Sequence, residues 1–397
     1  MRARLFALSV TVAGCGLWAG GADGPGPSGD ARDAGPDAWT SPADAALDAP
    51  PPKPFVPSHT SATFDLGASD LVDPTQIDTS KLQLAFGGAL AAPPSGIDFK
   101  DASGVAVLRV GAWKQSVGVI VTGSRPLIVL ASKAAFIAGR VDVAADHATP
   151  GPGGAEQAKG PGKGAGGEEG AYCDPGGGGA GFGDIGGAGG APPCGSANAG
   201  AGGVLYGAKL VDFGGGSGGG KGAGNCGGFG GGGGGAIQIA SLARIDVIGG
   251  GAIDASGGGG GGGCRSPGNG GGGGGSGGLV FLEAPAIDVG GALGANGGGG
   301  GEGGYADLFN GRDGQDGANG LPDLTPAAGG GASSTDRPGG VGGARAAPAG
   351  QPPAKANVDN TGGGGGAVGR IWLRTRGAQA TTPSGKISPA PSFDTSL

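Results

Sequence analysis

Two serines stand at the centre of a Gly-x-Ser-x-Gly pattern, which some hydrolases use to present a nucleophile between a strand and a helix. Ser217 and Ser276 are both flanked by glycines at the required positions. Both lie in tracts of nearly pure glycine, where such a match is expected by chance. The two histidines, His59 and His147, fall beside turn-forming residues and are predicted to be solvated rather than to act as bases. The sequence therefore predicts no catalytic residue.

The sequence contains partial matches to phosphate- and nucleotide-binding motifs, but these lack the neighbouring residues or elements that such motifs require. A phosphate-binding loop requires Gly-Lys followed by Ser or Thr, but glycine follows both Lys163 and Lys221. Matches to Gly-x-Gly-x-x-Gly are frequent, and none has the strand before it and the helix after it that give this motif its meaning. We expect no bound cofactor.

Acidic and aromatic residues gather in one glycine-rich segment. Oxygen-rich loops can hold calcium, but the spacing here matches neither an EF-hand nor the calcium-binding nonapeptide repeats. Solvated turn residues are the favoured alternative to calcium, and no metal site is predicted. Aromatic rings among small residues also make this segment the best candidate for contact with a glycan or a protein partner. The candidate contact residues are Glu302, Tyr305, Asp307, Phe309, Asp313 and Asp316.

Four of the five cysteines lie in the glycine-rich part of the chain, at Cys173, Cys194, Cys226 and Cys264. An even number of cysteines in an exported chain predicts disulfides. Three connectivities are possible, and we favour the pairing of sequence neighbours, Cys173 with Cys194 and Cys226 with Cys264. Zinc is disfavoured because the chain has no Cys-x-x-Cys pair and no histidine near these cysteines.

Four aliphatic runs with period-two alternation lie beside or between the glycine tracts, which predicts strands. They begin at Leu127, Ile237, Leu279 and Ile371. Without a gap, Leu127 and Val129 superpose on Leu279 and Phe281, and the run from Ile237 superposes on them up to two extra residues near Gly249–Gly251. Each run reads as a strand, a corner and a strand, and stacked copies could share one core. We therefore predict an all-β fold, a β-solenoid resembling a parallel β-helix, with glycine-rich insertions at its corners.

The glycine tracts leave two interpretations open. Glycine makes up 106 of the 397 residues, and ordering it requires dense hydrogen bonding because no side chains contribute burial. Helices of the polyproline II class could supply this, and Gly311–Gly320 keeps glycine at every third position. Here the chain resembles the polyglycine-helix adhesin tips of phage tail fibres and the glycine-rich repeat families of bacterial surfaces, a compositional likeness that implies no binding residues. The alternative is a β-sandwich with disordered glycine loops.

The N-terminus carries an export signal. Arg2 and Arg4 precede a short apolar segment that ends in Val12-Ala13-Gly14-Cys15. This pattern resembles a bacterial lipobox, which implies that residues 1–14 are a signal peptide and that Cys15 is lipidated. Gly16 would then follow the lipidated residue, which in such proteins points to the outer membrane. An ordinary secretory signal cleaved near Ala19 is the alternative.

Composition divides the rest of the chain. Residues 15–57 are rich in Pro, Ala, Asp and Gly and predict a flexible stalk, similar to those of surface lipoproteins from predatory and gliding soil bacteria. Residues 58–126 predict a β-rich cap, with strands over Leu82–Phe86, Val105–Val110 and Val117–Val121. Residues 127–376 form the predicted glycine-rich solenoid, and residues 377–397 a tail.

Net charge and family resemblance together narrow the classes of function that the sequence predicts. The net charge of −7, with few basic clusters, disfavours nucleic acid as a partner. Through its lipobox, stalk, repeats and the segment Thr122–Leu127, the chain resembles glycine-rich bacterial surface lipoproteins. This implies a non-catalytic structural or adhesive protein of the cell envelope, in the outer membrane and facing the periplasm or the cell surface. Its partners would be the membrane, through the lipid anchor, and a glycan or cell-surface molecule.

The alternative function is a β-helical envelope enzyme that acts on polysaccharides. Such an enzyme needs carboxylates and arginines that converge on one face of the fold. Arg370, Arg374 and Arg376 share one face of the last predicted strand, but the sequence identifies no acidic partner for them.

Overall fold

The computed structural model describes residues 55–170, 173–194, 197–207, 213–265, 269–305, 311–332, 337–354, 359–377, 380–382 and 384–397. Pro51–Leu397 forms one compact unit. The predicted signal peptide, Cys15 and the stalk up to residue 54 lie outside the described residues. Within the described ranges every regular element is a β-strand, which confirms the all-β prediction.

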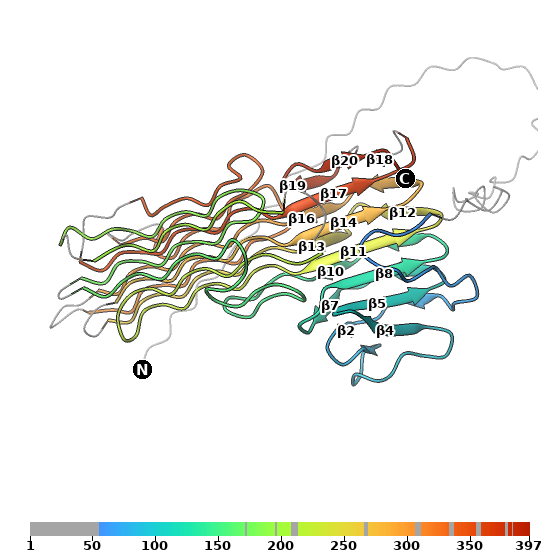
Figure 1. Cartoon of the computed structure of the whole chain (residues 1–397), viewed down its shortest axis with the longest axis horizontal. Helices are drawn as coiled ribbons and strands as arrows, with labels where there is room; N and C mark the ends of the chain where they lie inside the picture. Colours follow the sequence, from blue (N-terminus) through green and yellow to red (C-terminus); the bar gives the residue numbers. More distant parts are fainter. Residues whose placement is uncertain are drawn as a thin grey trace, which may run out of the picture. The chain divides into compact units, whose positions relative to one another are not determined.

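The strands form three sheets, visible on the labelled side of Figure 1. Sheet A contains β1 (Leu71–Val72), β6 (Trp113–Gln115), β9 (Ala135–Ile137), β12 (Arg244–Val247), β15 (Ala286–Val289) and β18 (Ala380–Thr381). Sheet B contains β3 (Gln83–Ala85), β2 (Gln76–Asp78), β7 (Val119–Thr122), β10 (Arg140–Asp142), β13 (Ala252–Asp254), β16 (Ala292–Gly294) and β19 (Lys386–Ser388). Sheet C contains β4 (Asp98–Ala102), β5 (Val105–Val110), β8 (Leu127–Ala131), β11 (Ala236–Ser241), β14 (Leu279–Glu283), β17 (Arg370–Arg374) and β20 (Ser392–Asp394).

The chain visits the sheets in a repeating order. From β5 to β19, each group of three consecutive strands places one strand in sheet C, one in sheet A and one in sheet B. Neighbouring strands are therefore parallel, except for the pairs β2 with β3 and β4 with β5 at one end of the sheets. The strands β5 to β7 and β18 to β20 extend the same sheets, so the predicted boundaries at residues 126 and 376 fall between adjacent strands of one architecture.

Aliphatic side chains from all three sheets pack into one core. In sheet C, Leu127 is paired with Ile237, Ile237 with Val280, and Val280 with Ile371, and all four are buried in that core. The predicted alignment of Leu127 with Leu279 is therefore wrong by one residue, and a slip of one residue exchanges the two faces of a strand.

The physical reason for that slip lies in the corner between sheets C and A. Leu282 and Ile287 are separated by one residue fewer than their partners Ile239 and Ile245. Because residues 279–282 are all apolar, alternation alone gives no sign of the shorter corner. In sheet A the predicted alignment is confirmed, since Val247 pairs with both Ile137 and Val289.

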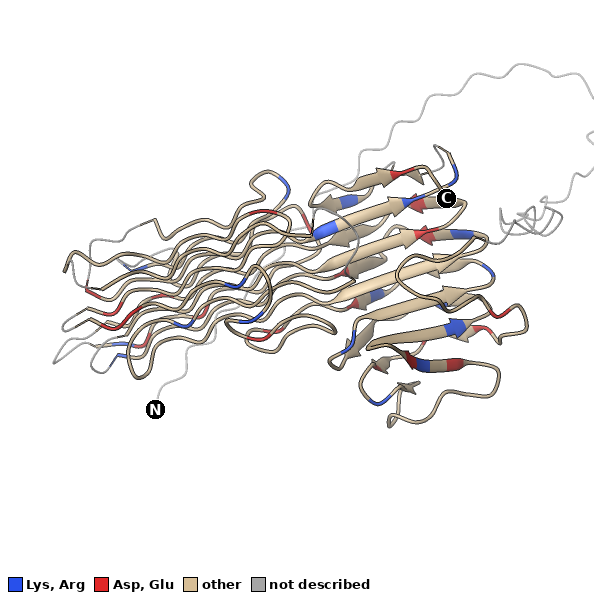
Figure 2. Cartoon of the chain, in the orientation of Figure 1, with Lys and Arg blue, Asp and Glu red and all other residues tan. Residues whose placement is uncertain are grey.

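All of the glycine-rich sequence leaves the sheets at the same corner. The segments 143–235, 255–278 and 295–369 each connect a strand of sheet B to the next strand of sheet C. In Figure 1 these segments run side by side away from the sheets. We call their described residues the glycine bundle. Figure 2 shows few charged residues along its parallel runs, with most charges at the turns and on the sheets.

Candidate functional site

The glycine bundle is held together by hydrogen bonds between backbones, and their pattern repeats every third residue. The N–H groups of Gly271 and Gly274 donate to the carbonyl oxygens of Thr361 and Gly364 on one neighbouring segment, both over 2.9 Å. Those of Gly272 and Gly275 donate to a second neighbour, at Gly261 and Gly258, and that of Gly273 to a third, at Gly220, all over 2.8 Å. The run Gly271–Gly275 thus faces three partners in rotation, which is the geometry of a chain with three residues per turn.

Close approach of these segments explains why the residues are glycines. A Cβ atom built on Gly273 would overlap the carbonyl oxygen of Gly178, and one built on Gly300 would overlap that of Gly363. Any side chain would therefore force neighbouring backbones apart and lengthen the hydrogen bonds that hold them. The runs are hydrogen-bonded and close-packed, as the interpretation of ordered glycine tracts predicts.

The segment Gly311–Gly320 uses its three-residue period in the same way. Every third residue is a glycine whose N–H donates to the neighbouring tract, from Gly314 to Gly263, from Gly317 to Gly260 and from Gly320 to Gly257. The residue before each glycine accepts a backbone N–H from that tract, at Asp313 from Arg265, at Asp316 from Gly262 and at Asn319 from Gly259. Asp313 and Asp316 are exposed, but one oxygen of each already binds the bundle.

Two of the other predicted contact residues, Glu302 and Tyr305, also lie in contacts within the chain. Glu302 is fully buried and accepts hydrogen bonds from both terminal nitrogens of Arg312, over 2.6 and 3.2 Å. The guanidinium of Arg337 lies 4.7 Å from the centre of the Tyr305 ring. Asp307 and Phe309 lie outside the described residues. Contact of this segment with a ligand stays a prediction.

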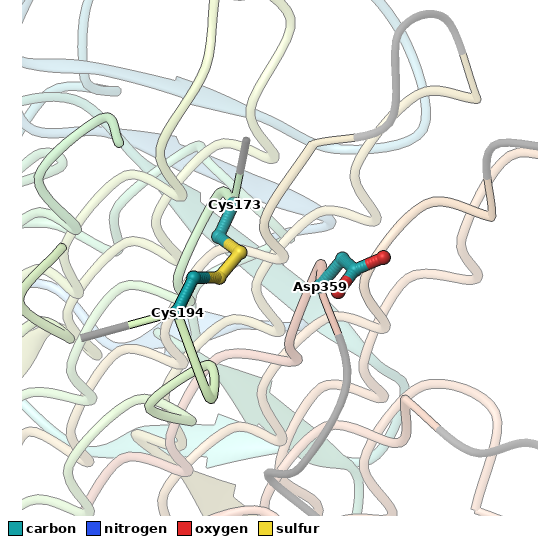
Figure 3. Close-up of side chains that lie close together, drawn as sticks. All are labelled: Cys173, Cys194 and Asp359. Carbon is teal, nitrogen blue, oxygen red and sulfur yellow. A yellow bond between two sulfur atoms is a disulfide. The ribbon is translucent and has the colours of Figure 1, made fainter. Parts of the chain in front are cut away.

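The cysteines pair as the sequence favours. Cys173 and Cys194 have Cα atoms 6.4 Å apart, and Cys226 and Cys264 have Cα atoms 5.7 Å apart, with both pairs at disulfide distance. Asp359 lies beside the first pair, as Figure 3 shows, with its carboxylate within 4.8 Å of both sulfurs. Two thiolates and a carboxylate could hold a metal ion, but a disulfide leaves neither sulfur as a thiolate. This group therefore fits a covalent staple rather than a metal centre.

A polar cluster that the sequence did not reveal crosses the outer face of sheet C. Glu283 of β14 is fully buried, and its Oε1 lies 3.1 Å from Nη1 of Arg374 on β17. Gln238 of β11 donates to the other carboxylate oxygen of Glu283 over 2.5 Å. Arg374 also pairs with Asp394 of β20 at 3.2 Å. These acidic partners of Arg374 could not be identified from the sequence, because they come from other circuits of the chain.

Residues 55–64 cover this cluster. The backbone N–H and hydroxyl of Ser58 donate to Glu283 over 3.0 and 2.6 Å. The neighbouring His59 has its Nδ1 atom 2.9 Å from Oε1 of Gln238, and its ring stacks on Phe213 with centroids 5.2 Å apart. His59 is half-buried, so the prediction of a solvated residue is wrong for it. With both oxygens of Glu283 engaged, the cluster holds Ser58 and His59 against sheet C.

The two serines of the Gly-x-Ser-x-Gly matches meet inside the glycine bundle. The N–H of Ser217 donates to the hydroxyl of Ser276 over 2.8 Å, and both residues are fully buried. The hydroxyl of Ser217 donates to that of Tyr206 over 2.9 Å. Tyrosine and backbone partners hold these serines inside the bundle.

One carboxylate has a strongly perturbed affinity for protons. Asp254 of β13 is fully buried, and burial raises its pKa to about 6 despite the opposing attraction of Arg140 at 2.6 Å. Hydrogen bonds from Ser256 also favour the charged form but do not outweigh burial. Asp254 lies in sheet B. Because its pKa in the folded protein is above its ordinary value, the stability of the fold depends on pH.

Comparison with known proteins finds no family model, no curated protein and no solved structure that matches this chain. Within the part of the chain that the structure describes, no helix has the length and hydropathy of a membrane span.

Proposed function

We propose that this protein is a lipid-anchored structural or adhesive protein of the bacterial cell surface, and that it is not an enzyme. In this proposal the three sheets are a β-solenoid of the parallel β-helix type, and the glycine bundle is a set of polyglycine II helices. The repeated order of sheets C, A and B supports the first assignment, and the three-residue hydrogen-bond period supports the second.

The observation that carries the proposal is the common origin of the glycine-rich segments. All three leave one corner and bind one another through their backbones, so they form a body that projects from the sheets. A bundle of this kind offers a long surface with few charged groups. Such a surface suits contact or spacing between surfaces better than catalysis, which needs converging titratable groups.

Anchoring is tested with the full chain and a Cys15→Ser variant. We expect the wild-type protein to incorporate labelled fatty acid and to fractionate with the outer membrane. The variant should lose the label and leave the membrane fraction. If wild-type protein lacks the label and is found unattached, the lipid anchor is refuted.

Adhesion is tested separately on cells that display the protein. Deletion of residues 295–369, joined to keep β16 and β17 connected, should reduce attachment to envelope glycans or to other cells. Cells that display Gly88→Ala, a change at an exposed position with open space around it, serve as the matched control. Equal attachment by all three would argue against an adhesive bundle.

A polysaccharide-acting enzyme is the second candidate, and the cluster around Glu283 is the observation that favours it. Carboxylate, arginine and histidine side chains meet on one face of a parallel sheet. Release of reducing ends from any envelope polysaccharide by the purified chain, abolished by Glu283→Gln, would establish this candidate in place of the first.

A further inference from the structure

A cavity of about 380 Å³ lies where the glycine bundle meets sheet C. Its side chains come from three aromatic residues, Phe182, Tyr206 and Phe213, from Leu279 of β14 and Arg370 of β17, and from Ala155 and Pro161 of the bundle. Most of the remaining lining is glycine backbone. This volume is in the range of small-molecule sites in proteins, and the cavity adjoins the cluster around Glu283 through Phe213, which lines the cavity and stacks on His59.

The aromatic wall is preformed and apolar. The rings of Phe182 and Tyr206 stack with centroids 4.5 Å apart. The hydroxyl of Tyr206 is already satisfied, because it accepts from Ser217 over 2.9 Å and donates to the carbonyl oxygen of Gly215 over 3.2 Å. Burial raises the pKa of Tyr206 to about 12, so the phenol stays neutral. The wall therefore offers a ligand apolar ring surface rather than a polar group, and chiefly that of the half-buried Tyr206, because Phe182 is only 4% exposed.

Arg370 supplies the positive charge of the cavity, and its known partners are neutral. Its Nε and Nη2 atoms donate to the carbonyl oxygen of Tyr206 over 3.2 and 2.7 Å, and its guanidinium lies 5.7 Å from the centre of the Phe182 ring. Within the described ranges no carboxylate forms an ion pair with it. Desolvation lowers the pKa of Arg370, which shows that its surroundings disfavour the charge.

The contrast with Arg374 on the same strand is informative. Arg374 is matched by two carboxylates, those of Glu283 and Asp394. Arg370, the first residue of β17, is half-buried where the glycine bundle meets the sheet, and no described carboxylate pairs with it. Charges that are partly removed from water are normally paired. Nε and Nη2 of Arg370 already donate to the carbonyl oxygens of Tyr206 and Phe182, so Nη1 is the nitrogen left to donate to a carboxylate. Among the described residues Arg370 thus has no carboxylate partner, which leaves its charge available to an anion bound in the cavity.

We propose that this cavity binds an amphipathic monocarboxylate, whose carboxylate pairs with Arg370 and whose flat apolar body lies against Phe182 and Tyr206. One cation matches one negative charge. The apolar lining favours an aromatic or hydrophobic body over a saccharide, because the hydroxyl groups of a sugar ring would find few partners there. The cavity is therefore a binding site distinct from the adhesive surface.

The test is a titration of the full chain by calorimetry with 2-naphthoate and with 2-naphthamide, which has the same rings but no charge. We expect one site per chain and at least tenfold tighter binding of the acid. Arg370→Gln should reduce the affinity for the acid to that for the amide. Arg244→Gln is the matched control, since Arg244 lies in sheet A and pairs with Asp246, and it should leave both affinities unchanged.

Equal affinities of the wild-type protein for acid and amide would overturn the proposal, as would naphthoate binding that Arg370→Gln leaves intact. If Arg370→Gln fails to fold, Arg370→Lys decides instead. A lysine keeps the charge but loses the two hydrogen bonds to the carbonyl oxygen of Tyr206 that orient the guanidinium, so acid binding should weaken while the preference over the amide persists. Loss of that preference in folded Arg370→Lys, or no binding of either compound to the wild-type protein, would also refute the site.

Discussion

Replacement of Gly273 by alanine should destabilise the protein. This is the reverse of the usual effect, since alanine restricts the unfolded chain and stabilises a protein wherever the native backbone can accept it. Gly273 lies at the centre of the glycine bundle, where its N–H donates to Gly220 and its carbonyl oxygen accepts from Gly231, both over 2.8 Å. An added Cβ atom would overlap the carbonyl oxygen of Gly178. The backbones must separate, which weakens contacts with the neighbouring runs of the bundle at Gly178, Gly220 and Gly231.

The expected magnitude follows from three contributions. Overpacking a close-packed interior costs about 1–3 kcal/mol, and weakening two hydrogen bonds costs up to about 1 kcal/mol each. Alanine restricts the unfolded chain and returns about 0.4–1 kcal/mol. The free energy of unfolding should therefore fall by about 2–3 kcal/mol.

Denaturant unfolding followed by circular dichroism measures this difference, with Gly88→Ala as the control. Gly88 is exposed, and a Cβ atom there would meet nothing within 4 Å. The control should change stability by less than about 0.5 kcal/mol. If both variants unfold at the same denaturant concentration with equal slopes, the tracts are not close-packed in solution and the reasoning fails.

Three further predictions concern the other clusters. Arg374→Ala should lower the free energy of unfolding by about 3–5 kcal/mol in denaturant, because Glu283 would stay buried without its cation; a change under about 1 kcal/mol would contradict a buried pair. The pKa of Asp254 is about 6 in the folded protein and 3.8 ordinarily, so the folded state binds the proton more tightly, and stability should fall by on the order of 3 kcal/mol as pH rises from about 4 to about 6. Asp254→Asn should flatten that part of the stability profile, and an unchanged profile would exclude Asp254 as its source. Replacing Cys226 and Cys264 by serine opens a sequence separation of 38 residues and should cost about 4 kcal/mol on the chain-entropy model, measured against wild-type protein under oxidising conditions; equal stability would show that the pair is not bonded.

Local sequence patterns predicted the elements well where one face of a strand is plainly apolar. The strand predicted over Val105–Val110 is β5, with the same bounds. The glycine at every third position of Gly311–Gly320 predicted the hydrogen-bond period of that segment, because a chain with three residues per turn returns each third residue to the same side. The favoured cysteine pairs also agree with the structure, since neighbours in the sequence lie on adjacent segments of the bundle.

The sequence by itself thus determined that the chain forms strands and glycine-rich segments, because alternation and period are properties of short stretches. Only the tertiary structure decided which face of β14 is inside, since that depends on the length of a corner and on the neighbouring strands. It also decided that Arg374 meets Glu283 while Arg370 faces a cavity. Residues from separate circuits of the chain become neighbours only when parallel strands stack, and no local pattern encodes which of them will meet.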